Sequence, residues 1–265
     1  MRVFVEGVGL LGPGLDGWQA ARAVLAGAAP YQSAPTVVTA VDLLPAAERR
    51  RIGVPIKLAL AAGCAAFAHA GRDAADTATV FTSSSGDGDN LHNICATLAS
   101  SQREISPTRF HNSVHNAPAG YWSIATRSRA PSTSLGCHDA SFAAGLLDAA
   151  AQITVDDIAV ALITYDQPYP EPLHGVRAIG ASFGAALVMT PHATDHAFAT
   201  LDITLEPAAA GSTRMTDPLL DEIRRGVPAA RCLPLLAALA RDVPATVLLE
   251  HGGHGQLRVE VAPWR

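Results

Sequence analysis

Residues 55–70 (PIKLALAAGCAAFAHA) constrain the fold most, because this segment is apolar on every side and rich in alanine. A helix on the surface would carry one polar face, so the pattern predicts a helix that is enclosed by protein. Its longest run without polar side chains, Leu58 to Ala68, is shorter than the roughly 20 residues that a membrane span needs. The segment therefore predicts the central helix of a globular fold, with no membrane span.

Apolar, β-rich segments alternate with helical patterns along the rest of the chain, which predicts an α/β layered fold. Strands are expected at residues 2–9, 78–82, 132–135, 158–164, 185–190 and 201–205, followed by a hairpin of 245–250 with 256–261. Besides the central helix, helices are expected at residues 18–25, 91–98, 217–225 and 229–241, and one more runs to Ile153. The pattern contains no internal repeat.

Composition excludes several classes of protein. The chain has 265 residues, of which 49% are hydrophobic, and a net charge of −5, so it can bury a sizeable core and disorder is not expected. Its one basic cluster, Glu48 to Arg51, is typical of a solvated helix face, and no nucleic-acid partner is expected. Glu6 interrupts the first apolar stretch, which argues against an export signal and favours a cytoplasmic protein.

Several short motifs suggest chemistry but lack the context that the chemistry requires. Gly180 to Gly184 spells GxSxG around Ser182, yet a loop is expected before that serine and a strand after it, where a hydrolase elbow needs the reverse. The Ser83–Asn90 loop fits a tight connection better than a metal or phosphate site. His111 and His115 have no glutamate between them, and the turn from His251 to His254 is typical of a hairpin. No metal or cofactor is expected.

The most informative stretch is Arg129 to Leu146, in which a short strand turns at small residues into an Ala/Gly-rich helix. Free N–H groups and the helix dipole favour an anion at such a helix start. Asp139 occupies this point. It is either the group at the position of a reactive anion or only the N-cap of the helix. Cys137, two residues earlier, is an alternative occupant. The four cysteines (Cys64, Cys95, Cys137 and Cys232) form no CxxC pair and are expected to be reduced.

This stretch resembles the nucleophile segment of the β-ketoacyl synthases, which have the thiolase-like fold. Counted from Pro131 without a gap, the family's cysteine falls on Asp139 and the alanine before it on His138. Residues 2–27, 110–120 and 182–188 are similar to the family's opening strand and helix, its asparagine-containing helix and a later strand. The resemblance covers residues 1 to about 190. It implies a ketosynthase N-terminal half at 1–194, with residues 195–265 as a helix-hairpin extension packed on it.

The departures from the family decide the function that the resemblance implies. Condensation needs a thiolate and two histidines, whereas this chain has a carboxylate at Asp139 and lacks the family's histidine loops in full. The chain is therefore similar to chain-length factors, non-catalytic subunits that pair with an active synthase, especially in aryl-polyene systems. The implied partners are a β-ketoacyl synthase and, through it, an acyl carrier protein. The implied tunnel or interface residues are Phe110, Val114, His115, Asn116, Tyr121, Trp122, Ser134 and His138.

Under this hypothesis, strand 132–135 pairs across the dyad with the synthase, and a helix over 111–125 lies against it. Two other classes stay open. The first is a stand-alone hydrolase or acyltransferase that uses Ser182 or Cys137, and the second is an acyl-binding homodimer that needs no synthase.

Overall fold

The computed structural model describes residues 1–38, 42–208, 211–253 and 255–264. Within these residues the strands form one mixed sheet of nine strands, in the order β4-β3-β5-β6-β1-β7-β9-β8, with β2 paired to β1. Strand β3 runs parallel to β4 and β5, and the other neighbours are antiparallel. The strands are β1 (Arg2–Gly12), β2 (Leu15–Asp16), β3 (Ala78–Thr82), β4 (Ser132–Leu135), β5 (Val160–Asp166), β6 (Phe183–Thr190), β7 (Ala199–Pro207), β8 (Ala245–Gly252) and β9 (Gly255–Pro263).

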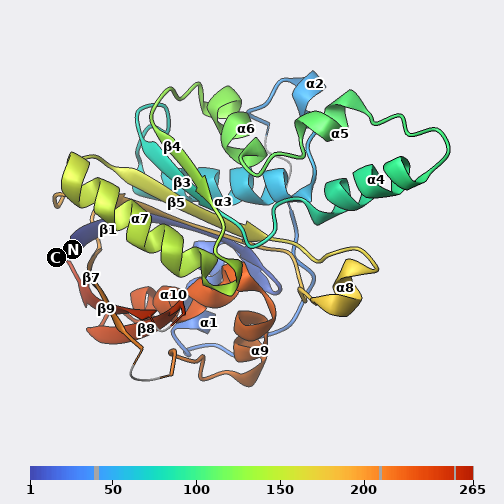
Figure 1. Ribbon diagram of the computed structural model, residues 1–265. Helices are drawn as coiled ribbons and strands as arrows, with labels where there is room; N and C mark the ends of the chain where they lie inside the picture. The colour runs from blue at the N-terminus through green and yellow to red at the C-terminus, as the bar shows by residue number, and fades with distance from the viewer. Residues whose placement is uncertain (39–41, 209–210, 254, 265) are drawn as a thin grey trace.

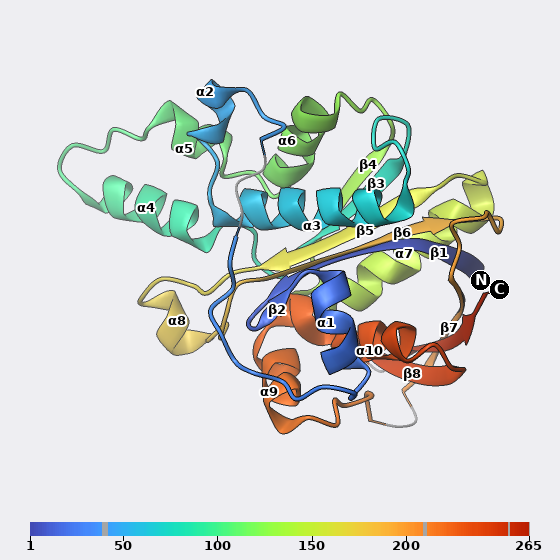
Figure 2. The ribbon, with the colours of Figure 1, turned by 180° about the vertical axis from the view of Figure 1, so that it is seen from behind.

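Helices cover both faces of the sheet (Figures 1 and 2). Helix α3 lies on one face with α6 beside it, and α7, α10 and α1 lie on the other. The helices are α1 (Trp18–Leu25), α2 (Ala46–Arg49), α3 (Val54–Ala70), α4 (Gly88–Ala99), α5 (Pro107–His111), α6 (Ala117–Thr126), α7 (Ser141–Asp156), α8 (Leu173–Val176), α9 (Pro218–Gly226) and α10 (Leu233–Arg241). Two short 3-10 helices, η1 (His138–Ala140) and η2 (Pro228–Cys232), precede α7 and α10.

The strand period of two divides the buried side chains between two cores. On β5, Leu162 faces the α7 and α10 side, whereas Ala161 and Ile163 face α3. On β6, Leu187 and Val188 divide in the same way. The central strands are buried on both faces, which explains why their sequences read as continuous apolar runs.

Helix α3 lies directly on β1 because two glycines of that strand carry no side chain. A Cβ atom on Gly9 would stand 1.9 Å from the carbonyl oxygen of Ala62, and one on Gly7 would stand 2.1 Å from that of Ala66. Backbone and helix therefore meet without side chains between them. The expectation of an enclosed central helix is confirmed, since most of α3 is buried.

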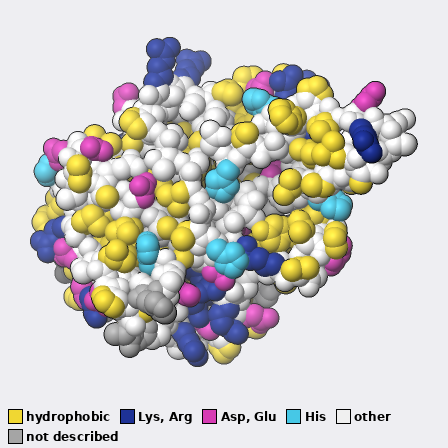
Figure 3. Space-filling view, in the orientation of Figure 1, with side chains coloured by type: hydrophobic (Ala, Val, Ile, Leu, Met, Phe, Trp, Pro, Cys, Tyr) yellow, Lys and Arg dark blue, Asp and Glu magenta, His cyan; other side chains and the backbone are white. Residues whose placement is uncertain are grey.

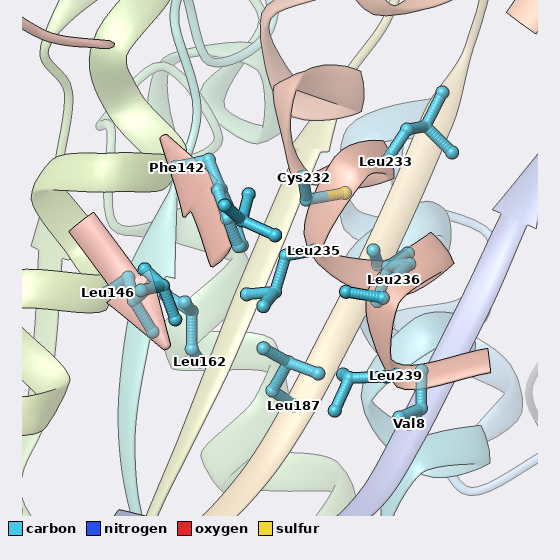
Figure 4. Close-up of a cluster of buried hydrophobic side chains, with 14 of the residues drawn as sticks. Val8, Phe142, Leu146, Leu162, Leu187, Cys232, Leu233, Leu235, Leu236 and Leu239 are labelled. Carbon is cyan, nitrogen blue, oxygen red and sulfur yellow. The ribbon is translucent and has the colours of Figure 1, made fainter. Parts of the chain in front are cut away.

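Residues after 195 continue the same sheet. Strand β7 pairs with β1 and β9, and β9 pairs with β8. Figure 4 shows side chains of η2 and α10 among those of β1, β6, β5 and α7, with Leu235 and Leu239 beside Leu187. The C-terminal segment thus shares one core with the preceding residues.

The expected α/β layered fold is confirmed, and most predicted elements lie within a few residues of their observed bounds. One helix expectation is wrong: residues 111–125 are not a single helix, because α5 ends at His111 and α6 begins only at Ala117. Prolines at residues 107 and 118 each occupy the first turn of their own helix, where a missing N–H costs least. In the described part of the chain, no helix has the length and apolar character to cross a membrane.

Candidate functional site at the start of helix α7

The chain changes direction sharply between β4 and α7. His138 adopts φ 51°, a left-handed conformation that is uncommon for a residue with a side chain. The hydroxyl of Ser141 closes the turn, since it accepts a bond from the Cys137 N–H at 2.9 Å and donates one to the His138 carbonyl at 2.7 Å. The N-cap of α7 is Ala140.

Asp139 is not the N-cap of α7, so that expectation is wrong. Among the described residues, its carboxylate is hydrogen-bonded to two arginines and to no backbone N–H. Arg177 donates to one oxygen at 2.6 Å, and Arg231 lies 3.5 Å from the other. Arg231 also reaches Glu250 on β8, at 3.2 Å. The side chain is therefore held by cations from distant parts of the chain.

The cavity beside this carboxylate is too small for an acyl chain. It has a volume of about 10 Å³ and is lined by Asp139, Phe142, Arg231, Leu248 and Glu250, among others. Such a volume is about that of one water molecule. Among the described residues, the cavity that adjoins Asp139 is thus smaller than an acyl chain requires.

The two alternative nucleophiles lie at a turn and at the start of a strand. Cys137 is exposed at the turn before η1. Ser182 precedes strand β6 directly, and its carbonyl accepts a bond from Thr36 at 2.6 Å. A hydrolase elbow requires a helix at that point. His251 is at the end of β8, and His254 lies outside the described residues.

Sequence analysis missed the buried carboxylate of Asp166, at the end of β5. It is fully buried and accepts bonds from the Ser83 hydroxyl and from the N–H groups of Ser84 and Ala229, at 2.8–2.9 Å. Burial raises its pKa to about 7. These bonds join the loop after β3 to the first turn of η2. A single aspartate after an apolar strand gave the only sequence signal.

An apolar surface lies over α5 and α6. The side chains of Phe110, Val114 and Ile124 are 67%, 53% and 49% exposed, and they border a hollow of about 560 Å³. Figure 3 shows hydrophobic side chains exposed over this part of the molecule. Tyr121 lies beneath them at the floor of the hollow and donates its hydroxyl to Asn112 at 3.2 Å.

Trp122 does not line this hollow. It is 1% exposed and packs against Phe67 and Phe81, with ring centroids 5.4 and 6.2 Å away. The reason is helical geometry: residues 121 and 122 point about 100° apart on α6, so only one of them can lie under the apolar surface.

A second, polar hollow of about 500 Å³ adjoins the first, on the other side of the N-terminal turn of α6. It is lined by His115, Asn116, Ser123 and Ser134, among others. Nε2 of His115 and Oγ of Ser134 are buried and have no hydrogen-bond partner among the described residues. Strand β4, which carries Ser134, is the edge of the sheet, so its outer side is open to a further strand.

Of the predicted site residues, the structure therefore brings Phe110, Val114 and Tyr121 to one hollow and His115 and Ser134 to the neighbouring one, while Asn116 borders both. His138 is exposed and lies beside Asp139 at 3.5 Å. The polar hollow also adjoins the turn before α7, since a Cβ atom on Gly136 would stand 3.5 Å from the ring of His115.

The fold is the layered α/β fold of the thiolase-like condensing enzymes. A model of the N-terminal domain of β-ketoacyl synthases matches residues 18–223, so this chain belongs to the β-ketoacyl synthase family. A search of curated proteins gave no match.

Solved structures show the same fold over the whole chain. One is the ketosynthase ApeO in complex with its chain length factor ApeC from Xenorhabdus doucetiae, with 22% identity, a TM-score of 0.74, and coverage of 98% of this chain and 99% of that one. The ishigamide ketosynthase/chain length factor has 13% sequence identity and a TM-score of 0.73, with full coverage of both chains. The AntDE:AntF complex, a type II ketosynthase with its acyl-carrier protein, has 11% sequence identity and a TM-score of 0.77, with coverage of 98% of this chain and 99% of that one.

Proposed function

We propose that this chain is a non-catalytic subunit of the chain-length-factor kind, which pairs with an active β-ketoacyl synthase and shapes the acyl tunnel in aryl-polyene biosynthesis. The observation that carries the proposal is the ion-paired carboxylate of Asp139, in the position where the family resemblance calls for a cysteine thiolate. A carboxylate held by two arginines is a weak nucleophile toward a thioester.

The surface around β4 supports a synthase as the partner. Three features lie on adjoining parts of the molecule. They are the open edge of β4, the apolar side chains of Phe110 and Val114, and the polar atoms of His115 and Ser134 that have no partner among the described residues. Buried polar atoms without partners cost about 1–3 kcal/mol each. A second chain that supplies both a strand and hydrogen-bonding groups would relieve that cost. The likeness to ketosynthase/chain length factor complexes supports the same arrangement.

Co-expression with an affinity-tagged synthase from the neighbouring gene tests the pairing. We expect poor solubility of this chain alone, rescue by the synthase, and co-purification in equal amounts. A stable homodimer that does not bind the synthase would instead support an acyl-binding protein, and the heterodimer proposal would fail.

Exchange of Asp139 for cysteine tests the non-catalytic role. We expect Asp139→Cys to create no condensing activity. The chain still lacks the family's two catalytic histidine loops, and the adjoining cavity is too small for an acyl chain. A separate experiment treats the wild-type chain with a labelled acyl thioester. Transfer of the acyl label to the chain, abolished by Cys137→Ala or by Ser182→Ala, would contradict the non-catalytic role. That outcome would identify a stand-alone acyltransferase or hydrolase.

The side chain of Phe110 tests the role in chain length. Its ring is exposed on the apolar surface, and we propose that its bulk limits growth of the acyl chain by steric exclusion. Phe110→Ala in the reconstituted pair should therefore give products at least one extension unit longer, measured by mass spectrometry. Leu98→Ala, at an exposed position on α4, is the control and should leave product length unchanged.

A further inference from the structure

Two carboxylates from the family-matched part of the chain hold one element of the C-terminal segment. Asp166 accepts the N–H of Ala229 at 2.8 Å, in the first turn of η2, and Asp139 lies 3.5 Å from Arg231 in the same element. The family match ends at residue 223, so η2 and β8 both lie beyond it. The contacts therefore join the matched domain to residues that follow it.

The contacts of Asp139 form a chain of alternating charges. Arg177 pairs with Asp139, Asp139 with Arg231, and Arg231 with Glu250, at 2.6, 3.5 and 3.2 Å. The side chains of the two arginines are 27% and 21% exposed, so water and salt screen these pairs less than they screen a fully exposed pair.

The end of β8 lies against the same turn. A Cβ atom on Gly252 would stand 3.8 Å from Cβ of Ala140 in η1. Leu248 and Glu250 of β8 line the small cavity together with Phe142 and Asp139. Residues of both η2 and β8 thus lie against the start of α7.

We propose that Asp139 is a positioning residue: it is an ionic latch that fixes η2 and the end of β8 over the start of α7 and keeps the cavity there closed. The residue acts within its own chain, through Arg177 and Arg231, and its role does not depend on a synthase partner. Breaking the latch loosens the C-terminal cover and leaves the α3 side of the sheet unchanged.

Hydrogen exchange of the full-length protein tests the latch. In Asp139→Asn, which keeps the shape of the side chain and removes its charge, amide exchange of residues 228–232 and 248–252 should rise about fivefold, the factor expected for a partly exposed ion pair. Exchange of α3, on the other face of the sheet, should not change.

Asp202→Asn is the matched control. Asp202 pairs with Arg2 at 2.7 Å, and the side chains of both aspartates are 41% exposed. This variant removes an equivalent charge at a distant pair and should leave the exchange of η2 unchanged. If both variants loosen η2 equally, the effect is one of net charge and the latch is wrong.

A double variant completes the test. Arg231→Gln should also loosen η2. Asp139→Asn combined with Arg231→Gln should loosen η2 by less than the sum of the two single effects, since both variants remove the Asp139–Arg231 contact and each also removes one contact of its own. Three results would overturn the proposal: wild-type exchange in Asp139→Asn, an equal rise in α3, or fully additive effects. None of them bears on the pairing with a synthase.

Discussion

His69 is a titratable residue whose environment favours the neutral form. Its Nδ1 accepts the N–H of Val8 at 2.9 Å, and its ring packs against Phe198 with centroids 5.5 Å apart. Burial lowers the pKa of His69 below its ordinary value. Protonation would cost the imidazole this hydrogen bond.

The pKa shift of His69 makes stability depend on pH. Because the folded state binds the proton less readily than the unfolded state, the contribution is complete above the unfolded pKa of about 6.5 and declines as the pH falls below it. The contribution of His69 to the free energy of unfolding in urea should therefore fall between pH 7.5 and pH 5.5, while Asp166, whose pKa is raised to about 7, contributes a change of opposite sign over the same range. In His69→Gln, which keeps an acceptor that does not titrate, this part of the fall should vanish; an identical fall in the variant would show that other groups cause it.

The residues that matter most at the start of α7 also show the limit of sequence analysis. The helix start and the carboxylate of Asp139 could be found from local pattern, because small residues and a short strand precede them. Its partners could not, because Arg177 and Arg231 are 38 and 92 residues away and no spacing rule connects them. The N-cap expectation failed for this reason: long-range arginines replaced the local N–H donors.

At the scale of elements, the close contact of α3 with β1 makes a sharp prediction. Gly9→Ala should lower the free energy of unfolding by about 2 kcal/mol or more, because the new methyl group would collide with the backbone of α3. Gly226→Ala is the control, since a Cβ atom there meets nothing within 4 Å, and it should be neutral or mildly stabilising. Urea denaturation of the two variants measures the difference, and equal stabilities would contradict the close packing.

The surface over α5 and α6 makes a second prediction at this scale. Val114→Glu should weaken binding to the synthase at least tenfold, because it places a charge on an apolar contact surface. The chain's own stability should change by less than about 0.5 kcal/mol, since Val114 is 53% exposed. Val155→Glu, at an 80% exposed valine on α7, is the control. Titration of the partner by calorimetry gives the affinities, and equal affinities for both variants would exclude Val114 from the interface.

The elements themselves were predictable to different degrees. The central strands and α3 follow from continuous apolar runs, because burial on both sides needs no polar positions. The break between α5 and α6 was missed, since one helix over 111–125 was expected from the family resemblance and Pro118, in the first turn of α6, was not taken as a helix start. The burial of Trp122 could not be predicted either. Helix α6 is apolar on most sides, so its sequence does not show which side packs against α3.

At the scale of the whole molecule, the α7 face of the sheet and its edge at β4 differ in how far they are covered. The C-terminal segment completes the core on the α7 face and covers the start of that helix with ion pairs. The opposite edge, at β4, leaves backbone, apolar and polar groups without partners among the described residues. The small cavity at the start of α7 and the open sheet edge both agree with the pairing with a synthase that we propose.

Native mass spectrometry of the chain co-expressed with the neighbouring synthase tests this account most directly. We predict a single species whose mass is the sum of one copy of each protein, with acyl label found only on the synthase. A homodimer of this chain, or acyl label on this chain itself, would contradict the account.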